Sequence, residues 1–138
     1  MDQLDVWCDG ACEPNPGHGG WAFVVLDGPE EINRGWGYDP QATNQRMEVR
    51  AAIEGIKGSP QGYLLRVHSD SKYTINCGSN LWRRKVNQDL WIELDEALKG
   101  RTVEWEWVKG HSGVWLNELV DKLANKACRE RQSQAQAR

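Results

Sequence analysis

The chain has 138 residues, of which 39% are hydrophobic and 27% charged, and this is the size and composition of a single soluble globular domain. Its 20 acidic and 17 basic residues give a formal net charge of −3, which argues against a protein that binds nucleic acid through a generally basic surface. No apolar run is long enough to span a membrane, and the N-terminus lacks the features of a signal peptide, so we expect a cytoplasmic protein with no membrane partner.

The N-terminal part of the chain predicts three strands. Leu4, Val6 and Cys8 alternate with polar or aromatic residues, which indicates a strand with one apolar face. Short turns separate this strand from two further ones, so we expect an antiparallel meander. We expect Asp39-Pro40 to end the strand pattern. The three strands are predicted over 3–12, 21–26 and 31–38.

Helices and strands alternate in the remainder of the chain. Thr43 or Asn44 can cap a helix that runs to Lys57, with Gly58 as its stop. The later elements are a strand over 63–68, a short helix over 71–77, a helix from Asn87 or Gln88 to Gly100, a strand over 102–108 and a helix over 116–129.

This order of elements predicts an α/β fold. A meander followed by β-α-β crossovers gives a five-stranded mixed sheet, antiparallel in the meander and parallel beyond it, with helices on both faces. We expect one domain over 1–131 and a polar C-terminal tail over 132–138 that frays.

Acidic residues stand at positions that the fold would bring together. Asp9 and Asp70 each follow a strand, and ligands gather at the carboxyl ends of parallel strands. Glu48 lies in the first helix, and Asp121 lies one turn after Asn117 in the last helix. Converging carboxylates favour hard divalent cations such as Mg²⁺, whereas the four cysteines form no CxxC pair that would indicate zinc. From spacing alone, four unrelated surface acids remain the alternative.

Several short motifs in a fixed order resemble type 1 ribonuclease H over nearly the whole chain. Each motif is weak alone, but their order and spacing make the combined match strong. The resemblance rests on Asp9-Gly10, Asn15-Pro16-Gly17, Thr43 to Glu48, Ser69-Asp70-Ser71, Asp89-Leu90-Trp91, Trp105 to His111, and Asn117-Glu118 with Asp121.

The resemblance implies a catalytic centre with two metal ions. Asp9, Glu48, Asp70 and Asp121 match the four metal-binding carboxylates of the family, with Asp9 bridging two Mg²⁺ ions, for which Mn²⁺ is a possible substitute. His111 matches a histidine on a mobile loop that assists proton transfer or product release.

The resemblance also implies contacts to an RNA–DNA hybrid. One group matches residues that line the minor groove and contact the ribose 2′-hydroxyl, by which RNA is told from DNA. A second group matches a pocket for a phosphate of the DNA strand, although helix capping is the ordinary role of its members. The groove group is Cys12, Asn15, Asn44 and Gln45; the phosphate group is Thr43 and Asn87; Trp82 is a candidate to stack on a DNA sugar, and Asn117 belongs to the same substrate-binding set.

The chain departs from many bacterial members of the family in one segment. Leu81 to Asn87 is too short to hold their basic helical protrusion, so the sequence resembles the subgroup without it. Arg84, with its basic neighbours, and Lys72 are candidates for compensating phosphate contacts, while a solvated turn is the alternative for the arginine segment. Gln41 stands where some relatives carry an arginine in the phosphate pocket.

The leading interpretation is an endoribonuclease that hydrolyses the RNA strand of RNA–DNA hybrids, leaving 5′-phosphate and 3′-hydroxyl ends. One alternative is a non-catalytic module on the same fold that binds hybrids or double-stranded RNA, and the set of four acids argues against it. Another is a related nuclease for a different nucleic acid, and Asn15, Asn44 and Gln45 argue against that. We expect a monomer with no obligate protein partner.

Overall fold

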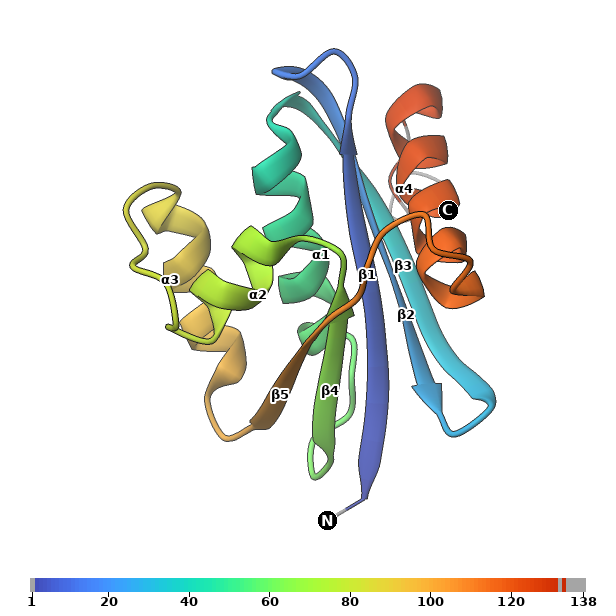
Figure 1. Ribbon diagram of the computed structural model, residues 1–138, viewed down its shortest axis with the longest axis vertical. Helices are drawn as coiled ribbons and strands as arrows, with labels where there is room; N and C mark the ends of the chain where they lie inside the picture. The colour runs from blue at the N-terminus through green and yellow to red at the C-terminus, as the bar shows by residue number, and fades with distance from the viewer. Residues whose placement is uncertain (1, 132, 134–138) are drawn as a thin grey trace.

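The computed structural model describes residues 2–131 and 133, which form a central sheet with helices packed on both sides (Figure 1). The strands are β1 (Gln3–Cys12), β2 (Gly17–Asp27), β3 (Glu30–Ala42), β4 (Leu64–Ser69) and β5 (Thr102–Trp107). The helices are α1 (Asn44–Lys57), α2 (Lys72–Gly78), α3 (Gln88–Leu98) and α4 (Trp115–Glu130). None of the described helices is long and apolar enough to cross a membrane.

The sheet has the predicted mixed topology. Its strand order is β3-β2-β1-β4-β5; the β1/β2 and β2/β3 pairs are antiparallel, and the β1/β4 and β4/β5 pairs are parallel. The predicted α/β fold with an antiparallel meander and parallel strands is therefore confirmed. β1 lies at the centre, so both of its faces are covered and its middle residues are buried.

The two faces of the sheet carry different helices. One face holds the main core, in which Val6 and Cys8 of β1 meet Val49 and Ile53 of α1, and α2 and α3 add to the same layer. The other face packs on α4, where Trp7 and Val24 meet Val120. Figure 1 shows α4 alone on its side of the sheet, over β1, β2 and β3. The alternation of side chains along β1 thus supplies two cores at once.

Glycines allow both helix layers to approach the strands closely. A Cβ atom at Gly10 would overlap the backbone of Met47 and Glu48 in α1, and one at Gly20 would overlap the backbone of Ala124 and Cys128 in α4. The first of these contacts matters most for the site, because it brings α1 against the carboxyl half of β1.

The expected break at Asp39-Pro40 is wrong, since β3 continues to Ala42. β3 is an edge strand, where a proline without an N–H group costs no ladder hydrogen bond. The partner strand also starts earlier than expected, at Gly17, which pairs with Ala42 across a register shift. This longer pairing holds the 12–17 loop beside the start of α1.

The predicted frayed tail over 132–138 falls mostly outside the described residues. Ser133 is described, and its hydroxyl accepts a hydrogen bond from the Tyr38 N–H at 3.1 Å.

Candidate active site

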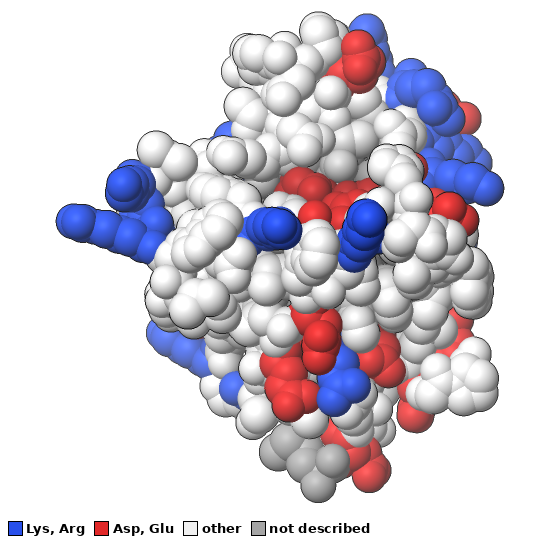
Figure 2. All heavy atoms as spheres, in the orientation of Figure 1, with Lys and Arg blue, Asp and Glu red and all other residues white. Residues whose placement is uncertain are grey.

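Three of the predicted metal ligands converge at one end of the central strands. Asp9, Glu48 and Asp70 each place a carboxylate oxygen within 4.8 Å of the others, and Asp9 and Glu48 are only 3% and 6% exposed. Figure 2 shows acidic side chains gathered in a hollow on this face, with basic side chains on both sides of it. The chance-acid alternative is inconsistent with such a cluster.

The sheet register explains why two of the acids meet. Trp7 of β1 lies opposite His68 of the parallel strand β4, and Asp9 and Asp70 each stand two residues further along. Glu48 comes from α1, and its carboxylate accepts a hydrogen bond from the Gly10 N–H. The site is therefore built where the central parallel strands end and α1 crosses them.

The protein environment opposes the ionisation of these acids. Burial is the main cause that raises the pKa of Asp9 to about 7, and the charges of Asp70 and Asp121 raise it further, against hydrogen bonds from Gly10 and Glu48 that lower it. Burial, followed by the charge of Asp9, also raises the pKa of Glu48 well above its usual range. Close carboxylates of this kind need shared protons or cations to balance them.

Asp121 of α4 lies at the margin of this group. It is outside the close cluster of three, although its charge contributes to the raised pKa of Asp9. Its carboxylate accepts a hydrogen bond from the Asn125 side chain at 3.1 Å, which orients it from within the same helix. The structure thus brings three of the four predicted ligands together and places the fourth nearby.

Neighbouring groups hold Asp70 from several directions. The Asn117 Nδ2 group donates to its Oδ2 at 3.4 Å, and the Trp107 indole donates to its backbone carbonyl at 3.1 Å. Asn117 is 3% exposed, and among the described residues its Oδ1 atom is a buried acceptor without a donor. Clustered carboxylates with an unsatisfied amide oxygen form the hard oxygen donor set that suits Mg²⁺ or Mn²⁺.

His111 stands on the loop between β5 and α4. It is exposed and adopts a left-handed backbone conformation with φ of 54°. The preceding Gly110 packs directly against Asp70: a Cβ atom there would lie 2.9 Å from the Asp70 Oδ2 atom. The loop therefore reaches the acidic cluster through Gly110, with His111 next to that point of contact.

The predicted groove residues lie together on the rim near the start of α1. The Asn44 N–H donates to the Asn15 Oδ1 atom at 3.1 Å, which joins the 12–17 loop to the helix. The Cys12 thiol donates to the carbonyls of Pro14 and Ala42. Asn15, Asn44 and Gln45 are exposed, so their free polar groups face solvent.

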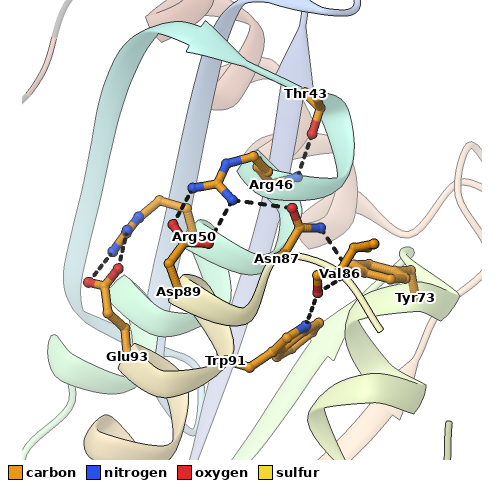
Figure 3. Close-up of polar contacts among 9 residues, drawn as sticks. All are labelled: Thr43, Arg46, Arg50, Tyr73, Val86, Asn87, Asp89, Trp91 and Glu93. Atoms are coloured by element: carbon orange, nitrogen blue, oxygen red, sulfur yellow. Dashed lines mark hydrogen bonds and ion pairs between the residues drawn. The ribbon is translucent and has the colours of Figure 1, made fainter. Parts of the chain in front are cut away.

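The two predicted phosphate-pocket residues differ in their local roles. Thr43 caps α1 as expected, with its hydroxyl accepting from the Arg46 N–H at 3.2 Å. Asn87 stands at the N-cap of α3, as predicted, but its side chain makes no cap hydrogen bond. That side chain lies between Arg46 and Tyr73 instead (Figure 3).

The remaining candidates lie around α2 and the segment after it. Lys72 is exposed and its ammonium lies 4.8 Å from the centre of the Trp107 ring. Trp82 is 47% exposed and lines a common surface pocket with the exposed apolar side chains of Leu81 and Val86. Arg84 instead turns inward, where its guanidinium bonds Asp95 at 2.9 Å and two carbonyls at the end of α2. These contacts already occupy the guanidinium, and a phosphate contact of Arg84 stays a prediction.

Arg46, which pairs α1 with α3, is a site residue that was not predicted from the sequence. Its guanidinium donates to both carboxylate oxygens of Asp89, at 2.9 and 2.6 Å. The sequence contains a signal for this pairing. Two arginines four residues apart in α1, Arg46 and Arg50, match two acidic residues four residues apart in α3, Asp89 and Glu93, so opposite charges stand on successive turns of the two helices.

The fold and the site together define an α/β protein with a cluster of three carboxylates at the ends of its central strands. The sequence matches the family model for RNase H over residues 1–129. It is 41% identical over 143 residues to the Ribonuclease H of Gluconobacter oxydans (strain 621H), covering 93% of each chain. The chain therefore belongs to the ribonuclease H family and is a nuclease of that family.

Solved structures agree with this assignment. LC9-RNase H1, a type 1 RNase H with the type 2 active-site motif, has a TM-score of 0.81 and 26% identity, covering 97% of this chain and 75% of that one. LC11-RNase H1, solved in complex with an RNA/DNA hybrid, has a TM-score of 0.78 and 17% identity, covering 93% of this chain and 98% of that one; this likeness concerns the fold.

Proposed function

We propose that this chain hydrolyses the RNA strand of RNA–DNA hybrids, with two Mg²⁺ or Mn²⁺ ions held by Asp9, Glu48, Asp70 and Asp121. The observation that carries the proposal is the buried cluster of Asp9, Glu48 and Asp70 at the end of the central strands. When bound, such ions activate a water molecule and stabilise the leaving oxygen at a phosphodiester. The products are RNA fragments with 5′-phosphate and 3′-hydroxyl ends.

The residues of the chain divide the remaining tasks. Asn15, Asn44 and Gln45 contact ribose 2′-hydroxyls in the minor groove, supported by their shared exposed rim. Cys12 supports this rim, and Asn117 positions Asp70. His111 takes or delivers a proton, or assists product release, from its exposed loop.

The DNA strand is bound by a separate set. Thr43 and Asn87 bind a phosphate, Trp82 stacks on a sugar and Lys72 adds a phosphate contact; the exposure of Trp82 and Lys72 supports this assignment. We further propose that residues 1–131 form the catalytic domain, that the protein is a cytoplasmic monomer without an obligate protein partner, and that it belongs to the subgroup without the basic protrusion.

One digestion assay tests the proposal. The full chain is incubated with end-labelled RNA–DNA hybrid, double-stranded RNA, single-stranded RNA and duplex DNA, in Mg²⁺, in Mn²⁺ and in EDTA. We expect cleavage of the RNA strand of the hybrid alone, dependent on the cation, with ends that are substrates for a 3′-hydroxyl ligase. Binding without cleavage would support the non-catalytic module instead, and cleavage of duplex DNA would point to the other class of nuclease.

A further inference from the structure

One residue of α1 contacts both members of the proposed phosphate pocket. The Arg46 backbone N–H donates to the Thr43 hydroxyl at 3.2 Å, and its guanidinium Nη1 donates to the Asn87 Oδ1 atom, also at 3.2 Å. Figure 3 shows Arg46 between these two side chains, which come from segments 44 positions apart in the sequence. Arg46 and Thr43 also line a common surface hollow with Gln41.

Hydrogen-bond chemistry gives these contacts a direction. A guanidinium only donates, so it fixes the Asn87 amide with Oδ1 toward Arg46 and the NH₂ group away from it. That NH₂ group gives one hydrogen to the Tyr73 hydroxyl at 2.9 Å. Within the described part of the chain its second hydrogen has no acceptor, and neither has the Thr43 hydroxyl hydrogen. Asn87 and Thr43 can thus each donate a hydrogen bond to a phosphate oxygen.

Arg46 is itself held in place. Asp89 accepts two hydrogen bonds from the guanidinium, and this pairing lowers the pKa of Asp89 to about 2. The backbone at Asn87 is fixed as well: it is left-handed with φ of 61°, and its carbonyl accepts from the N–H groups of Leu90 and Trp91. The positive charge of Arg46 is therefore balanced by Asp89, and its effect on Asn87 is one of orientation.

We infer that Arg46 is the positioning residue of the DNA-strand phosphate pocket, because its guanidinium turns the Asn87 acceptor toward itself and leaves the Asn87 donor for the phosphate, beside the Thr43 hydroxyl that its backbone N–H holds. This inference rests on the proposed function. Position 41, where some relatives carry an arginine, is glutamine in this chain, and the arginine next to the pocket comes from α1 instead.

The neighbouring turn of α1 offers a matched control. Arg50 makes the same two-pronged contact with Glu93 of α3, at 3.0 and 2.7 Å, and it also reaches Glu54. Like Arg46, it links α1 to α3 (Figure 3), but it does not contact Asn87. Loss of either arginine removes one interhelical tether, whereas only loss of Arg46 releases the Asn87 amide.

The experiment compares Arg46→Met with Arg50→Met in steady-state cleavage of a labelled hybrid. Losing an oriented hydrogen bond of about 1 kcal/mol corresponds to roughly a fivefold change, so we expect Arg46→Met to raise KM about 5- to 10-fold with kcat within about twofold. Arg50→Met should leave KM within about twofold of the wild-type value. Its Tm should fall by about as much as that of Arg46→Met, because each variant loses one contact between α1 and α3. Adding Asn87→Ala to Arg46→Met should raise KM no further, because the same contact is already lost.

A substrate change identifies the phosphate. In a series of hybrids, a neutral methylphosphonate replaces one phosphate of the DNA strand, at a different position in each substrate. At the position bound by the pocket, this replacement should raise KM for the wild type and for Arg50→Met, but not for Arg46→Met. Equal KM values for the two arginine variants, or additive effects with Asn87→Ala, would overturn the inference. If Arg46→Met fails to fold by circular dichroism, Asp89→Asn against Glu93→Gln makes the same comparison. If the wild-type protein does not cleave hybrids, the proposed function is refuted. If it cleaves them but the two arginine variants have equal KM values, or the effects are additive with Asn87→Ala, only the role of Arg46 is refuted.

Discussion

Asp9 of β1 and Glu48 of α1 accept hydrogen bonds from the same backbone N–H group, that of Gly10. The two carboxylates come from elements on different layers, and the absent side chain of Gly10 is what lets the layers meet. A single N–H dipole cannot balance two buried negative charges, in keeping with the raised pKa of both carboxyl groups. The folded state of the cation-free protein should therefore depend on pH.

We expect the free energy of unfolding in EDTA to fall as pH rises from about 4 to about 7. The pKa of Asp9 is about 7 in the folded protein against 3.8 for an ordinary aspartate, so its contribution is fully present below pH 3.8 and lost through pH 7. Asp89, with its pKa lowered to about 2, is already ionised throughout this window. Urea unfolding at half-unit pH steps measures the slope, and Asp9→Asn should flatten it. A slope unchanged in Asp9→Asn would show that Asp9 is not the titrating group.

Cation binding should reverse this loss of stability. Mg²⁺ binds the ionised carboxylates, so we expect 10 mM Mg²⁺ to raise Tm more at pH 7.5 than at pH 5. The measurement is a thermal melt with and without the cation at both pH values. Asp70→Asn should reduce the increase, because it removes one of the three clustered carboxylates. An equal increase at both pH values would indicate binding elsewhere on the acidic surface.

Asp9→Asn should abolish most activity without unfolding the protein. The asparagine Oδ1 atom can still accept from the Gly10 N–H, so the substitution keeps the shape and removes the charge. We expect kcat to fall by at least roughly 10²-fold, in line with the loss of a group that stabilises transition-state charge, and Tm in EDTA at pH 7.5 to rise. Cleavage assays on hybrid in Mg²⁺ and circular dichroism give the two readouts. Near-normal kcat would remove Asp9 from the metal centre.

Gly110→Ala should slow cleavage through Asp70. The new Cβ atom would lie 2.9 Å from the Asp70 Oδ2 atom, so either the carboxylate or the loop has to shift by several tenths of an ångström. We expect kcat to fall about tenfold or more, since misplacement of a catalytic group on this scale is costly. Ser112→Ala is the control in the same loop, because its hydroxyl bonds the Lys109 carbonyl rather than the acidic cluster. Equal activity of the two variants would place the loop away from the reacting centre.

The sequence predicted the elements better than the side-chain partners. The strand predicted from the alternation in β1 and the cap predicted at Thr43 rest on local signals, and both were confirmed. The burial of the second face of β1 was not predicted, because it depends on the packing of α4. The continuation of β3 past Pro40 depends on that strand being at the edge, which is a property of the sheet and not of the segment.

The candidate site shows the same division between local and tertiary information. The cluster of Asp9 and Asp70 could be predicted because the ends of adjacent parallel strands coincide. The contact of Asn87 with Arg46 could not, because it depends on how α3 packs on α1. The contacts of Arg84 with the end of α2 and with Asp95 could not be predicted either, since these partners become neighbours only after the segment between α2 and α3 folds back.

Arg84→Met should lower stability and leave hybrid binding nearly unchanged. The guanidinium bonds the Cys77 and Gly78 carbonyls and the Asp95 carboxylate, and it stacks 5.1 Å from the centre of the Trp91 ring. Its removal leaves the Gly78 carbonyl without this donor and the Asp95 carboxylate without its partner, although the Cys77 carbonyl still accepts from the Asn80 N–H. We expect a cost of about 1–3 kcal/mol and a Tm lower by several degrees.

The control for Arg84 is its exposed neighbour Arg83, for which Arg83→Met should change Tm by little. Thermal melts and KM for hybrid cleavage are measured on both variants over a range of salt concentrations. If KM rises several-fold in Arg84→Met and depends less on salt than in the wild type, Arg84 belongs to the substrate-binding surface. The reason is that each phosphate contact releases counterions, so a variant with one contact fewer has a weaker salt dependence. A KM within about twofold, together with a lower Tm, would establish that Arg84 acts by holding the segment after α2 against α3.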